Sequence, residues 1–415
     1  MTTTTAAGTL PGFLSSEVAA DPDAFYRRLR AEAPVHWDEG YQGYLISKHA
    51  DVGSAYRNPL FSTQNYEVSL QPVFGRSMLQ MDGAEHSRKK ALVTPYFRGK
   101  GLQKWAPVIA RNVATILDRS VASASAHIAR GFRPGDTVDL LADFGYYLPV
   151  YVITDMLGLP HSDYDRFFDW YSRHVAFLGN LARDPEIDER GRRATKELWE
   201  YLAPVIEDRR SNLGDDLISG LITAEIDGER LADLEILSHV TQLLNAGSET
   251  TGKALASMFA YLLRERELFE EVRDDRSQVI PAISETLRIS PPSQMNGRKV
   301  TQDCEIGGVP LPAGTLVMLL MASANRDEER FSHPDTFDFH RTDLAHEQTF
   351  TAAGDTFAFG SGRHFCLGAM LAKSELEMAS NVLLDRFPGM RLADGFVPEW
   401  SGLKMRSVDR LTVTL

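Results

Sequence analysis

A stretch of unusual length, residues 231–266, repeats apolar residues at three- and four-residue spacing and contains no proline. This spacing is the period of an amphipathic α-helix, and without proline nothing in the stretch breaks the backbone hydrogen bonds. Because so many of its residues are apolar, such a helix needs protein around it on several sides. We therefore expect one long helix that crosses the middle of the molecule.

The rest of the chain is mostly helical in pattern, with a few short strands. Helical spacing dominates from about residue 82 to 273, and a shorter helix ends at Ser290, before two prolines. The other predicted elements are a helix at 23–32, strands at 35–37 and 44–47, a strand–turn–strand at 305–315, a helix at 367–387 and a strand at 411–415. The pattern predicts a mainly α protein with a small β lobe. We expect a flexible tail at residues 1–12 and a single domain at residues 13–415.

Composition narrows the functional class. The chain has 415 residues, of which 43% are hydrophobic and 24% charged, as in globular proteins. Its net charge of −13 argues against nucleic-acid binding, which relies on basic surfaces, and favours solubility. The N-terminus lacks the features of a signal peptide, and no apolar run reaches the roughly 18 residues of a membrane span. We therefore expect a cytoplasmic protein without a membrane anchor.

The chain has only two cysteines, Cys304 and Cys366, and a disulfide between them would be unusual in a protein with these features. Cys366 lies in the segment Phe-Gly-Ser-Gly-Arg-His-Phe-Cys-Leu-Gly, residues 359–368. The two glycines before the cysteine allow a tight turn that passes close to a flat ligand. The helix predicted to begin after Cys366 favours a thiolate at its first turn. A buried structural cysteine beside a glycine-rich loop is the alternative.

Other residues of this segment also suit a bound group. Gly360 leaves the ligand side free of a Cβ, and Gly368 lets the following helix approach whatever lies against the sulfur. Phe359 can shield the sulfur from water. Arg363 and His364 can donate hydrogen bonds to an anion.

The segment resembles the haem-binding signature of the cytochromes P-450, Phe-Gly-x-Gly-x-His-x-Cys-x-Gly, and matches it at every position. The resemblance implies haem b (iron protoporphyrin IX) as the cofactor, with Cys366 as the axial thiolate ligand of the iron. It also implies that Phe359, Gly360 and Gly368 lie against the haem. Arg363 and His364 are then expected near a haem propionate.

A second constellation lies in the middle of the predicted long helix, at Asn-Ala-Gly-Ser-Glu-Thr-Thr, residues 245–251. Gly247 weakens the helix there, and the Thr250 hydroxyl can bond the Ala246 carbonyl four residues back, which bends helices. A satisfied core threonine is the alternative for this motif on its own. Beside the cysteine segment, it resembles the oxygen-activating motif of the same family. This implies Glu249 and Thr250 as a catalytic acid–alcohol pair, with Ala246 and Gly247 against the haem.

A third stretch, residues 82–90, resembles the family's haem-facing helix, in which a histidine and a basic residue four positions later bind a propionate. His86 and Lys90 are one turn apart on the same side, as that role requires. Lys90 departs from the more usual arginine, because lysine lacks the bidentate fork. Arg298 matches another propionate-binding arginine of the family. Plain surface charges are the alternative.

Glu285 and Arg288 lie three residues apart on one predicted helical face and could pair. Most such pairs are exposed and contribute little to stability. Together with Phe-x-x-Pro-x-x-Phe-Asp-x-x-Arg at residues 331–341, however, they resemble the structural salt-bridge triad of the family. This implies that Glu285, Arg288 and Arg341 hold the fold around the cysteine segment.

The resemblance covers residues 82 to 368 in the order of the family and implies its fold and activity. The implied fold is an α-rich triangular prism with a small β lobe and with the haem between the long helix and the cysteine segment. The implied reaction inserts one oxygen atom from dioxygen into an organic molecule, with electrons from a ferredoxin and its NAD(P)H-dependent reductase. A haem-thiolate enzyme that uses peroxide or rearranges its substrate, and a non-enzymatic haem sensor, are the alternatives.

By analogy with the family, four segments should line the substrate pocket, at residues 61–78, 167–181, 293–297 and 400–405. They mix the aromatic residues Tyr66, Phe74, Phe177 and Trp400 with the amides Gln294 and Asn296. This mixture predicts a mid-sized substrate with an apolar body and some polar groups, such as a natural-product intermediate.

The chain is acidic as a whole, but the net charge of residues 86–105 is positive, because this segment contains no acidic residue. The basic residues there are Arg88, Lys89, Lys90, Arg98, Lys100 and Lys104. A solvated basic face is one explanation. If part of the run lies with Arg363 on the cysteine side of the haem, it would steer an acidic ferredoxin.

Overall fold

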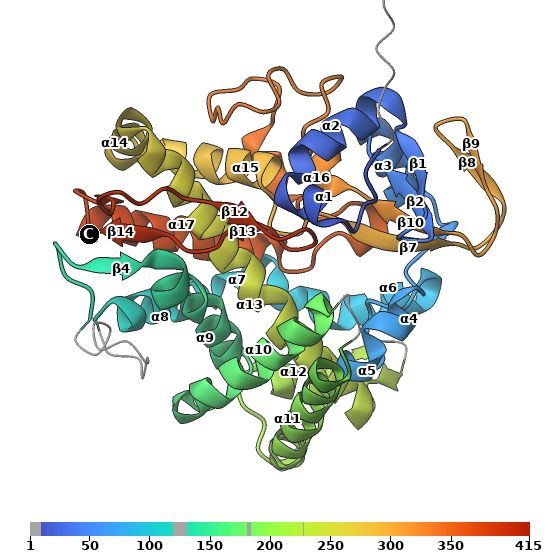
Figure 1. The fold of residues 1–415 in the computed structure, drawn as a ribbon. Coiled ribbons are helices and arrows are strands. Elements are labelled where there is room, and N and C mark those ends of the chain that lie inside the picture. Colours follow the sequence, from blue (N-terminus) through green and yellow to red (C-terminus); the bar gives the residue numbers. More distant parts are fainter. Residues whose placement is uncertain (1–9, 119–130, 181–183, 227) are drawn as a thin grey trace, which may run out of the picture.

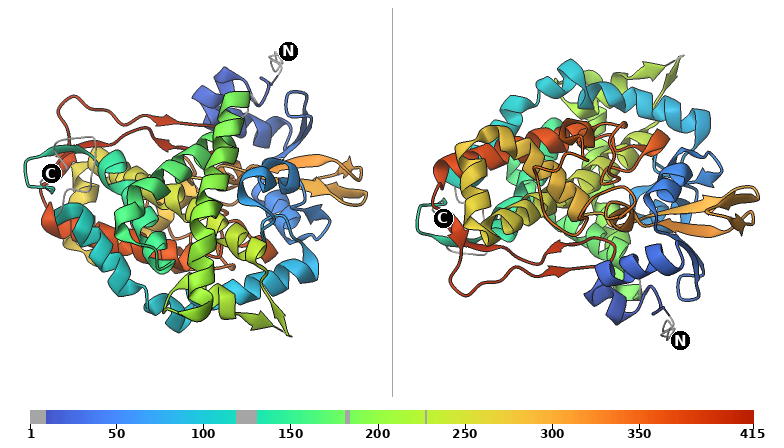
Figure 2. Two further views of the ribbon diagram at one scale, coloured as in Figure 1. Left: turned by 90° about the horizontal axis from the view of Figure 1, so that it is seen from below. Right: turned by 90° about the horizontal axis from the view of Figure 1, so that it is seen from above.

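The computed structural model describes residues 10–118, 131–180, 184–226 and 228–415. Most of the predicted tail, residues 1–9, therefore lies outside the described residues. The helix α13 (Asp233–Arg264) confirms the predicted long helix, and the rest of the described chain surrounds it. Figures 1 and 2 show α13 in the middle of the molecule, with other helices on several sides. Most of its side chains are buried, as its apolar composition predicts.

The other helices form the layers around α13, and α9, α10, α15 and α17 all contact it. In chain order the α-helices besides α13 are α1 (Ser16–Ala20), α2 (Pro22–Glu32), α3 (His49–Arg57), α4 (Tyr66–Ser69), α5 (Gln71–Phe74), α6 (Gly83–Val93), α7 (Gly99–Gln103), α8 (Ala106–Asp118), α9 (Tyr147–Met156), α10 (Tyr164–Gly179), α11 (Pro185–Ser211), α12 (Leu217–Thr223), α14 (Arg266–Asp274), α15 (Val279–Ile289), α16 (Met321–Ala324) and α17 (Ala369–Arg386). The predicted helices at 23–32 and 367–387 correspond to α2 and α17.

Close packing holds α13 against the turn that precedes α9. A Cβ on Gly252 would lie only 2.1 Å from the Gly145 carbonyl oxygen. Gly145 ends a short π-helical turn, Leu141–Gly145, and that turn leads directly into α9. Glycine at position 252 is therefore required for the two backbones to approach, because any side chain would push them apart.

The small β lobe is a sheet with the strand order β1-β2-β10-β7-β3. Its strands are β1 (Val35–Asp38), β2 (Gly43–Ile46), β3 (Phe61–Ser62), β7 (Asn296–Val300) and β10 (Leu316–Leu319). Neighbouring strands are antiparallel except β2 and β10, which are parallel. The predicted strand–turn–strand is confirmed as the hairpin of β8 (Cys304–Ile306) and β9 (Val309–Leu311), which projects from this end of the molecule (Figures 1 and 2). Cys304 lies in the hairpin, and neither cysteine forms a disulfide.

Shorter strands interrupt the stretch between residues 82 and 273 that we expected to be mostly helical. β4 (Thr137–Asp139) joins β11 (Arg391–Leu392) and β14 (Thr412–Thr414) in the order β11-β14-β4. The other two-stranded pairs are β5 (Glu225–Ile226) with β6 (Glu229–Arg230) and β12 (Trp400–Ser401) with β13 (Ser407–Val408). β4 is too short to show an alternating pattern, and its partner lies at the other end of the chain, so local spacing could not reveal it.

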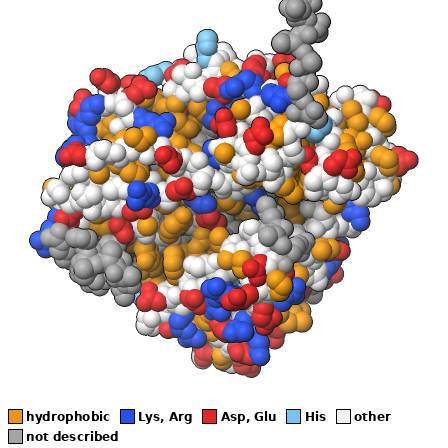
Figure 3. Space-filling model, viewed as in Figure 1, with side chains coloured by type: hydrophobic (Ala, Val, Ile, Leu, Met, Phe, Trp, Pro, Cys, Tyr) orange, Lys and Arg blue, Asp and Glu red, His pale blue; other side chains and the backbone are white. Residues whose placement is uncertain are grey.

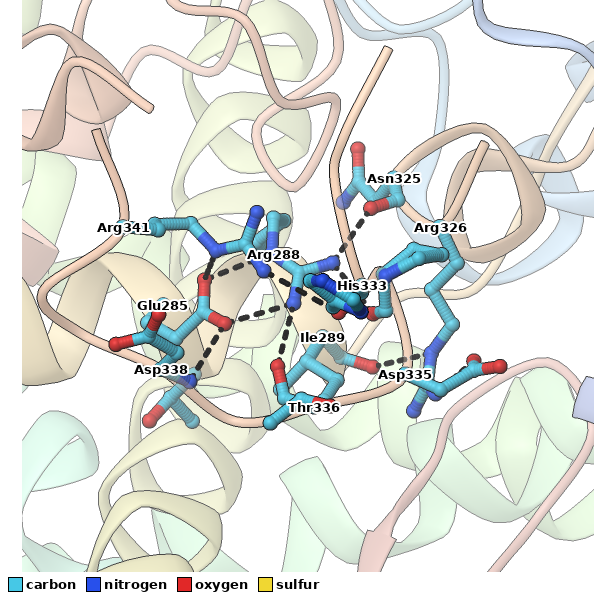
Figure 4. A network of polar contacts seen from close by, with 12 residues as sticks. Glu285, Arg288, Ile289, Asn325, Arg326, His333, Asp335, Thr336, Asp338 and Arg341 are labelled. Carbon is cyan, nitrogen blue, oxygen red and sulfur yellow. Dashed lines mark hydrogen bonds and ion pairs between the residues drawn. The ribbon is translucent and has the colours of Figure 1, made fainter. Parts of the chain in front are cut away.

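Glu285 on α15 is the centre of a buried polar network (Figure 4). Its carboxylate accepts two hydrogen bonds of 2.7 Å from the Arg288 guanidinium and forms an ion pair of 3.0 Å with Arg341. The backbone N–H of Asp338 donates to the same carboxylate. The charged side chains are almost fully buried, so their mutual contacts replace the water that they lose. This confirms the predicted salt-bridge triad and joins α15 to the loop before the cysteine segment.

The surface carries charges of both signs. On the face drawn in Figure 3, hydrophobic side chains gather in a band across the middle, and acidic and basic side chains are interspersed above and below it. Among the described helices, none is both long enough and apolar enough to span a membrane.

Candidate functional site

A cavity lies between α13 and the cysteine segment, and it collects most of the predicted site residues. Those that line it are His86, Lys90, Ala246, Gly247, Thr250, Phe359, Gly360, His364, Cys366 and Gly368. Glu249, Arg298 and Arg363 do not line it. Residues far apart in the sequence thus meet at one place, as the resemblance implied.

The cysteine segment forms a tight loop that presents Cys366 to this cavity. Gly360 and Gly362 both have φ of 67°, a left-handed conformation that glycine adopts at little cost. A Cβ on Gly362 would also lie 2.5 Å from the Tyr56 carbonyl oxygen. The Cys366 N–H donates to the Phe359 carbonyl oxygen at 2.9 Å and closes the loop. The two glycines are therefore needed for the turn, as the sequence predicted.

Opposing effects act on the Cys366 thiol. The Cys366 side chain is exposed to the cavity, but the surrounding protein separates it from bulk water, and this loss of solvation is the largest effect and raises the pKa of Cys366. Hydrogen bonds from the backbone N–H groups of Gly368 and Ala369, at the start of α17, and the charge of Lys90 act in the opposite direction. The sequence predicted the stabilising effect of the helix start but could not show the stronger effect of burial. Coordination to a metal ion would remove the proton in any case, because only the thiolate binds.

His86 on α6 has an unusual environment. Its side chain is buried, and its Nδ1 has no hydrogen-bond partner among the described residues. Burial and then the neighbouring His364 lower the pKa of His86 to about 4. The two imidazole rings lie 4.1 Å apart. A neutral imidazole with an unpaired nitrogen can still donate or accept one hydrogen bond.

His364 lies between His86 and an acidic residue that the sequence analysis did not single out. Its Nε2 is 3.2 Å from Oδ1 of Asp82. Burial raises the pKa of Asp82, but hydrogen bonds from His364 and Ser62 outweigh burial and hold that pKa at about 2. Asp82 therefore orients His364 beside His86. The position of Asp82, four residues before His86, was the only signal in the sequence.

Arg298 on β7 completes a site for an anion. It is only 4% exposed, and its guanidinium lies over the Tyr56 ring. It donates to the Gly297 carbonyl oxygen and forms no ion pair with any carboxylate among the described residues. Burial lowers the pKa of His364, and the nearby charge of Arg298 acts in the same direction. A buried cation without a counterion among the described residues, near His364, fits an anionic group such as the propionates of haem.

Lys90 makes a different contact from the propionate contact that the resemblance implied. Its Nζ donates to the carbonyl oxygens of Arg363 and Phe365, at 2.7 and 2.8 Å. The Lys90 ammonium therefore binds the backbone of the cysteine loop. The Arg363 side chain is exposed.

The middle of α13 provides the wall opposite Cys366. A Cβ on Gly247 would meet no atom within 4 Å, so glycine leaves space there. The Thr250 hydroxyl forms no hydrogen bond among the described residues, and in particular none to the Ala246 carbonyl. Our expectation of a bend produced by that bond is therefore wrong, and α13 is unbroken. The hydroxyl remains available to a partner in the cavity.

Glu249 does not line the cavity, and it pairs with a residue that the sequence analysis missed. Its carboxylate forms an ion pair with Lys253, one turn later on α13. The two side chains are only 15% and 12% exposed. The charge of Glu249 also raises the pKa of Tyr146 and Tyr171, after the larger effect of burial. The i, i+4 spacing of a glutamate and a lysine was the signal for this pair.

The predicted substrate pocket is confirmed only in part. Met78, Ser293 and Asn296 line the cavity. Phe74 and Phe177 instead belong to a separate hydrophobic cluster. The described part of the predicted segment 167–181 contributes no residue to the cavity, because α10 packs on α11 there.

Other predicted pocket residues also have structural contacts. Trp400 stacks near Tyr261 with ring centroids 5.0 Å apart, and the Gln294 amide donates to the Pro291 carbonyl oxygen. Tyr66 does not line the cavity. Sequence reasoning also missed Gln242, a buried amide on α13 that does line the cavity. Within an apolar helix pattern, a single glutamine gave no signal of its orientation.

A cysteine presented at the start of a helix, facing a long central helix and flanked by donors for an anion, is the arrangement of a haem-thiolate protein. The chain belongs to the cytochrome P450 family, whose sequence profile matches residues 37–388. Members of this family are monooxygenases with haem b as their cofactor. This chain is therefore an enzyme of that kind, and the alternative of a haem sensor is set aside.

Relatives match almost the whole chain. Pulcherriminic acid synthase from Bacillus subtilis is 37% identical over 96% of both chains, and nocardicin C N-oxygenase from Nocardia uniformis is 35% identical over 96% of both. The fold is similar to that of CYP109E1 from Bacillus megaterium in complex with testosterone, with a TM-score of 0.81 and 30% identity, covering 95% of this chain and 99% of that one. The family includes bacterial enzymes of secondary metabolism among these relatives.

Proposed function

We propose that this enzyme inserts one oxygen atom from dioxygen into a mid-sized intermediate of secondary metabolism, with electrons from a ferredoxin. The observation that carries the proposal is the position of Cys366, across one cavity from Gly247 and Thr250 of α13. Relatives named for the natural products pulcherriminic acid and nocardicin support the substrate class. When bound, haem supplies the site at which dioxygen is held and reduced.

The residues of the cavity divide into three roles in this proposal. Cys366 would hold the haem iron through its thiolate, and Lys90 orders the loop that presents it. His86, His364 and Arg298 would hold the propionates, because His86 and Arg298 are buried donors without a partner carboxylate among the described residues. The cavity-lining residues that would lie against the haem are Ala246, Gly247, Phe359, Gly360 and Gly368.

In this proposal Thr250 and Glu249 deliver the protons that the reaction needs. The Thr250 hydroxyl donates a hydrogen bond into the cavity, and it receives a replacement proton through water. Glu249 is paired with Lys253 and lies outside the cavity wall. To bring protons from solvent, its carboxylate must leave Lys253 and rotate about its side-chain bonds. The ion pair with Lys253 therefore controls how readily Glu249 takes part.

Electron transfer requires a docking site for the ferredoxin. The basic residues between positions 86 and 105 contribute less to such a site than the sequence suggested. Three of these side chains are paired within the chain: Arg88 with Glu229, Lys89 with Glu235 and Lys104 with Asp215. Arg98, Lys100 and Arg363 are exposed and form no ion pair with the described residues. The charge of Arg98 reaches Lys90, which binds the cysteine loop. We therefore propose Arg98, Lys100 and Arg363 as the ferredoxin contact.

Reduction kinetics test this docking site. Combined Arg98→Glu and Lys100→Glu substitutions should slow reduction by an acidic ferredoxin and weaken its dependence on salt. Lys104→Glu is the control, because Lys104 is already paired with Asp215. Equal rates for the double variant and the wild type at low salt would remove these residues from the contact. The electron source also bears on the location of the reaction. Because NAD(P)H is a cytoplasmic reductant, we expect the reaction to take place in the cytoplasm.

Turnover with isotopically labelled dioxygen tests the proposed reaction. Natural-product libraries are first screened for compounds that shift the haem spin state. Purified enzyme, ferredoxin, ferredoxin reductase and NADPH are then supplied with a compound that binds. One labelled oxygen atom should appear in the product. Product formation with hydrogen peroxide alone, and none with dioxygen and the electron carriers, would favour the peroxide-using alternative.

A further inference from the structure

Gln242 is a buried polar residue of α13 that faces the cavity without a hydrogen bond from the described protein. It is 6% exposed, lines the cavity, and its Oε1 has no hydrogen-bond partner among the described residues. Its amide nitrogen likewise forms no hydrogen bond there. Both ends of a buried carboxamide are thus free at the same wall. Leaving one buried polar atom without a partner costs about 1–3 kcal/mol, so a partner from the cavity is strongly favoured.

Thr241, the next residue before Gln242, and Asn296 across the cavity differ in this respect. The Thr241 hydroxyl accepts a hydrogen bond from Trp199 Nε1 and donates to the Leu237 carbonyl oxygen. The other carboxamide that lines the cavity, Asn296, donates to the Tyr56 hydroxyl at 2.9 Å. These contacts hold helices and strands together. Gln242 has no such contact with the described protein, so its amide is free to recognise a ligand.

The position of Gln242 relative to Thr250 places it at the substrate end of the cavity. The two residues are two helical turns apart on one face of α13, which corresponds to roughly 12 Å along the axis. Ala246, at the haem-facing wall of the proposed site, lies midway between them. A molecule bound by Gln242 therefore reaches the proposed oxidation site with atoms about 6–12 Å from its polar end.

The remaining wall near Gln242 is largely apolar. Met78, Leu79 and Leu243 line the same cavity. The preferred ligand therefore has one polar edge and an apolar body. A carboxamide offers an N–H donor and a C=O acceptor side by side, so the best partner offers the same two groups on one edge. A cis secondary amide does so, and outside proline a cis amide is found at low cost only within a ring.

We propose that Gln242 is a specificity-determining residue that binds the edge of a lactam in the substrate, with the apolar body of the substrate directed toward the haem. This inference rests on the proposed function and names the substrate class of the same site. The lactam N–H donates to Gln242 Oε1, and its carbonyl oxygen accepts from the Gln242 amide nitrogen. Oxidation then takes place on the part of the molecule remote from the lactam edge that is held.

A matched pair of probes tests this inference: 5-cyclohexylpiperidin-2-one and its N-methyl derivative, which lacks the donor. Dissociation constants are measured from the spin-state shift in the haem spectrum of the holoenzyme. The wild type should bind the N–H lactam about 10- to 100-fold more tightly. In Gln242→Leu the ratio of the two constants should fall to near one. Gln80→Met is the control, because the amide of this buried glutamine is fully engaged by Gly75 and Ser77, and it should keep the preference.

Three outcomes would overturn the inference. They are a wild-type ratio near one, an unchanged ratio in Gln242→Leu, and no spectral shift with the N–H lactam up to its solubility limit. The carbon-monoxide spectrum of each variant shows separately whether the haem and its thiolate ligand are intact. Incorporation of labelled oxygen into any other compound tests the proposed function independently. The failure of one proposal can therefore be distinguished from the failure of the other.

Discussion

The Lys90 Nζ lies 2.8 Å from the Phe365 carbonyl oxygen, and this hydrogen bond joins α6 to the residue that immediately precedes Cys366. A second bond, to the carbonyl oxygen of Arg363, fixes the same loop. A single side chain therefore connects the helix of the proposed propionate site to the backbone of the proposed thiolate site. In the sequence these two elements are far apart.

We expect Lys90→Met to loosen this loop. Two carbonyl oxygens lose a charged donor, which should lower the free energy of unfolding by about 1–3 kcal/mol. The carbon-monoxide complex should also lose its thiolate-type spectrum faster on warming. Lys89→Met is the matched control, since Lys89 pairs with Glu235 and not with the loop. Equal rates of spectral loss in the two variants would contradict the role assigned to Lys90.

Replacing each cysteine in turn tests whether Cys366, and not Cys304, is the ligand of the iron. In the reduced, carbon-monoxide-bound protein, Cys366→His should move the strongly red-shifted Soret band to the position seen with imidazole ligands. Cys304→Ser should leave it unchanged, because Cys304 lies in the β8–β9 hairpin. The opposite pair of spectra would show that Cys366 is not the ligand.

Thr250 is expected to control coupling of electron use to product. Thr250→Ala removes the free hydroxyl from the cavity wall but leaves the cysteine loop and the anion site intact. The variant should still consume NAD(P)H and dioxygen, with most electrons released as hydrogen peroxide and little product formed. Thr250→Ser should retain most of the coupling. Full coupling in Thr250→Ala would mean that protons arrive by another route.

Glu249 has a separate readout. Glu249→Gln should slow dioxygen consumption itself, because it removes the carboxylate proposed to pass on protons. Lys253→Met releases the Glu249 carboxylate from its ion pair and should not reproduce that slowing. The comparison is made from steady-state rates at saturating ferredoxin. If both variants slowed equally, the ion pair would act as a structural contact and not as part of proton supply.

The buried network around Glu285 predicts a large effect on stability. Glu285→Gln leaves Arg288 and Arg341 buried without a full counter-charge, and the free energy of unfolding should fall by about 3–5 kcal/mol. Glu32→Gln is the control, because its ion pair with Arg28 is exposed, and it should change stability little. Denaturant unfolding of both variants provides the measurement. A small effect at Glu285 would mean that the surrounding loop relaxes to admit water.

A buried histidine predicts how stability depends on pH. His174 on α10 accepts from the Asn245 amide and donates to the Thr195 hydroxyl, which itself donates to the Val73 carbonyl oxygen. Burial lowers its pKa from 6.5 to about 4. The unfolded chain therefore binds the proton more readily, and stability is lost as pH falls from 6.5 toward 4.

At about pH 5 this loss should amount to about 2 kcal/mol relative to neutral pH. The loss is measured as the difference in unfolding free energy between the two conditions. His174→Gln should remove that part of the pH dependence, because glutamine does not titrate. Arg173→Met serves as a neighbouring control that keeps the imidazole. An unchanged pH profile in His174→Gln would show that other groups account for the acid sensitivity.

The sequence alone determined the features that depend on local spacing. The period of residues 231–266 predicted α13, because a helical hydrogen-bond pattern is set by residues three and four apart. The glycines around Cys366 predicted the tight loop, because only glycine adopts its left-handed backbone without strain. The spacing of Glu285 and Arg288 likewise predicted a pair within one helix.

Only the tertiary structure decided which side chains meet across distant elements. It assigned Lys90 to the carbonyls of the loop before Cys366, and it left the Gln242 amide facing a cavity without a protein partner. It also removed Phe177 and Trp400 from the expected pocket. The physical reason is that a hydrogen bond or a burial depends on atoms brought together by the packing of the whole chain. A residue type and its neighbours in sequence do not specify those atoms.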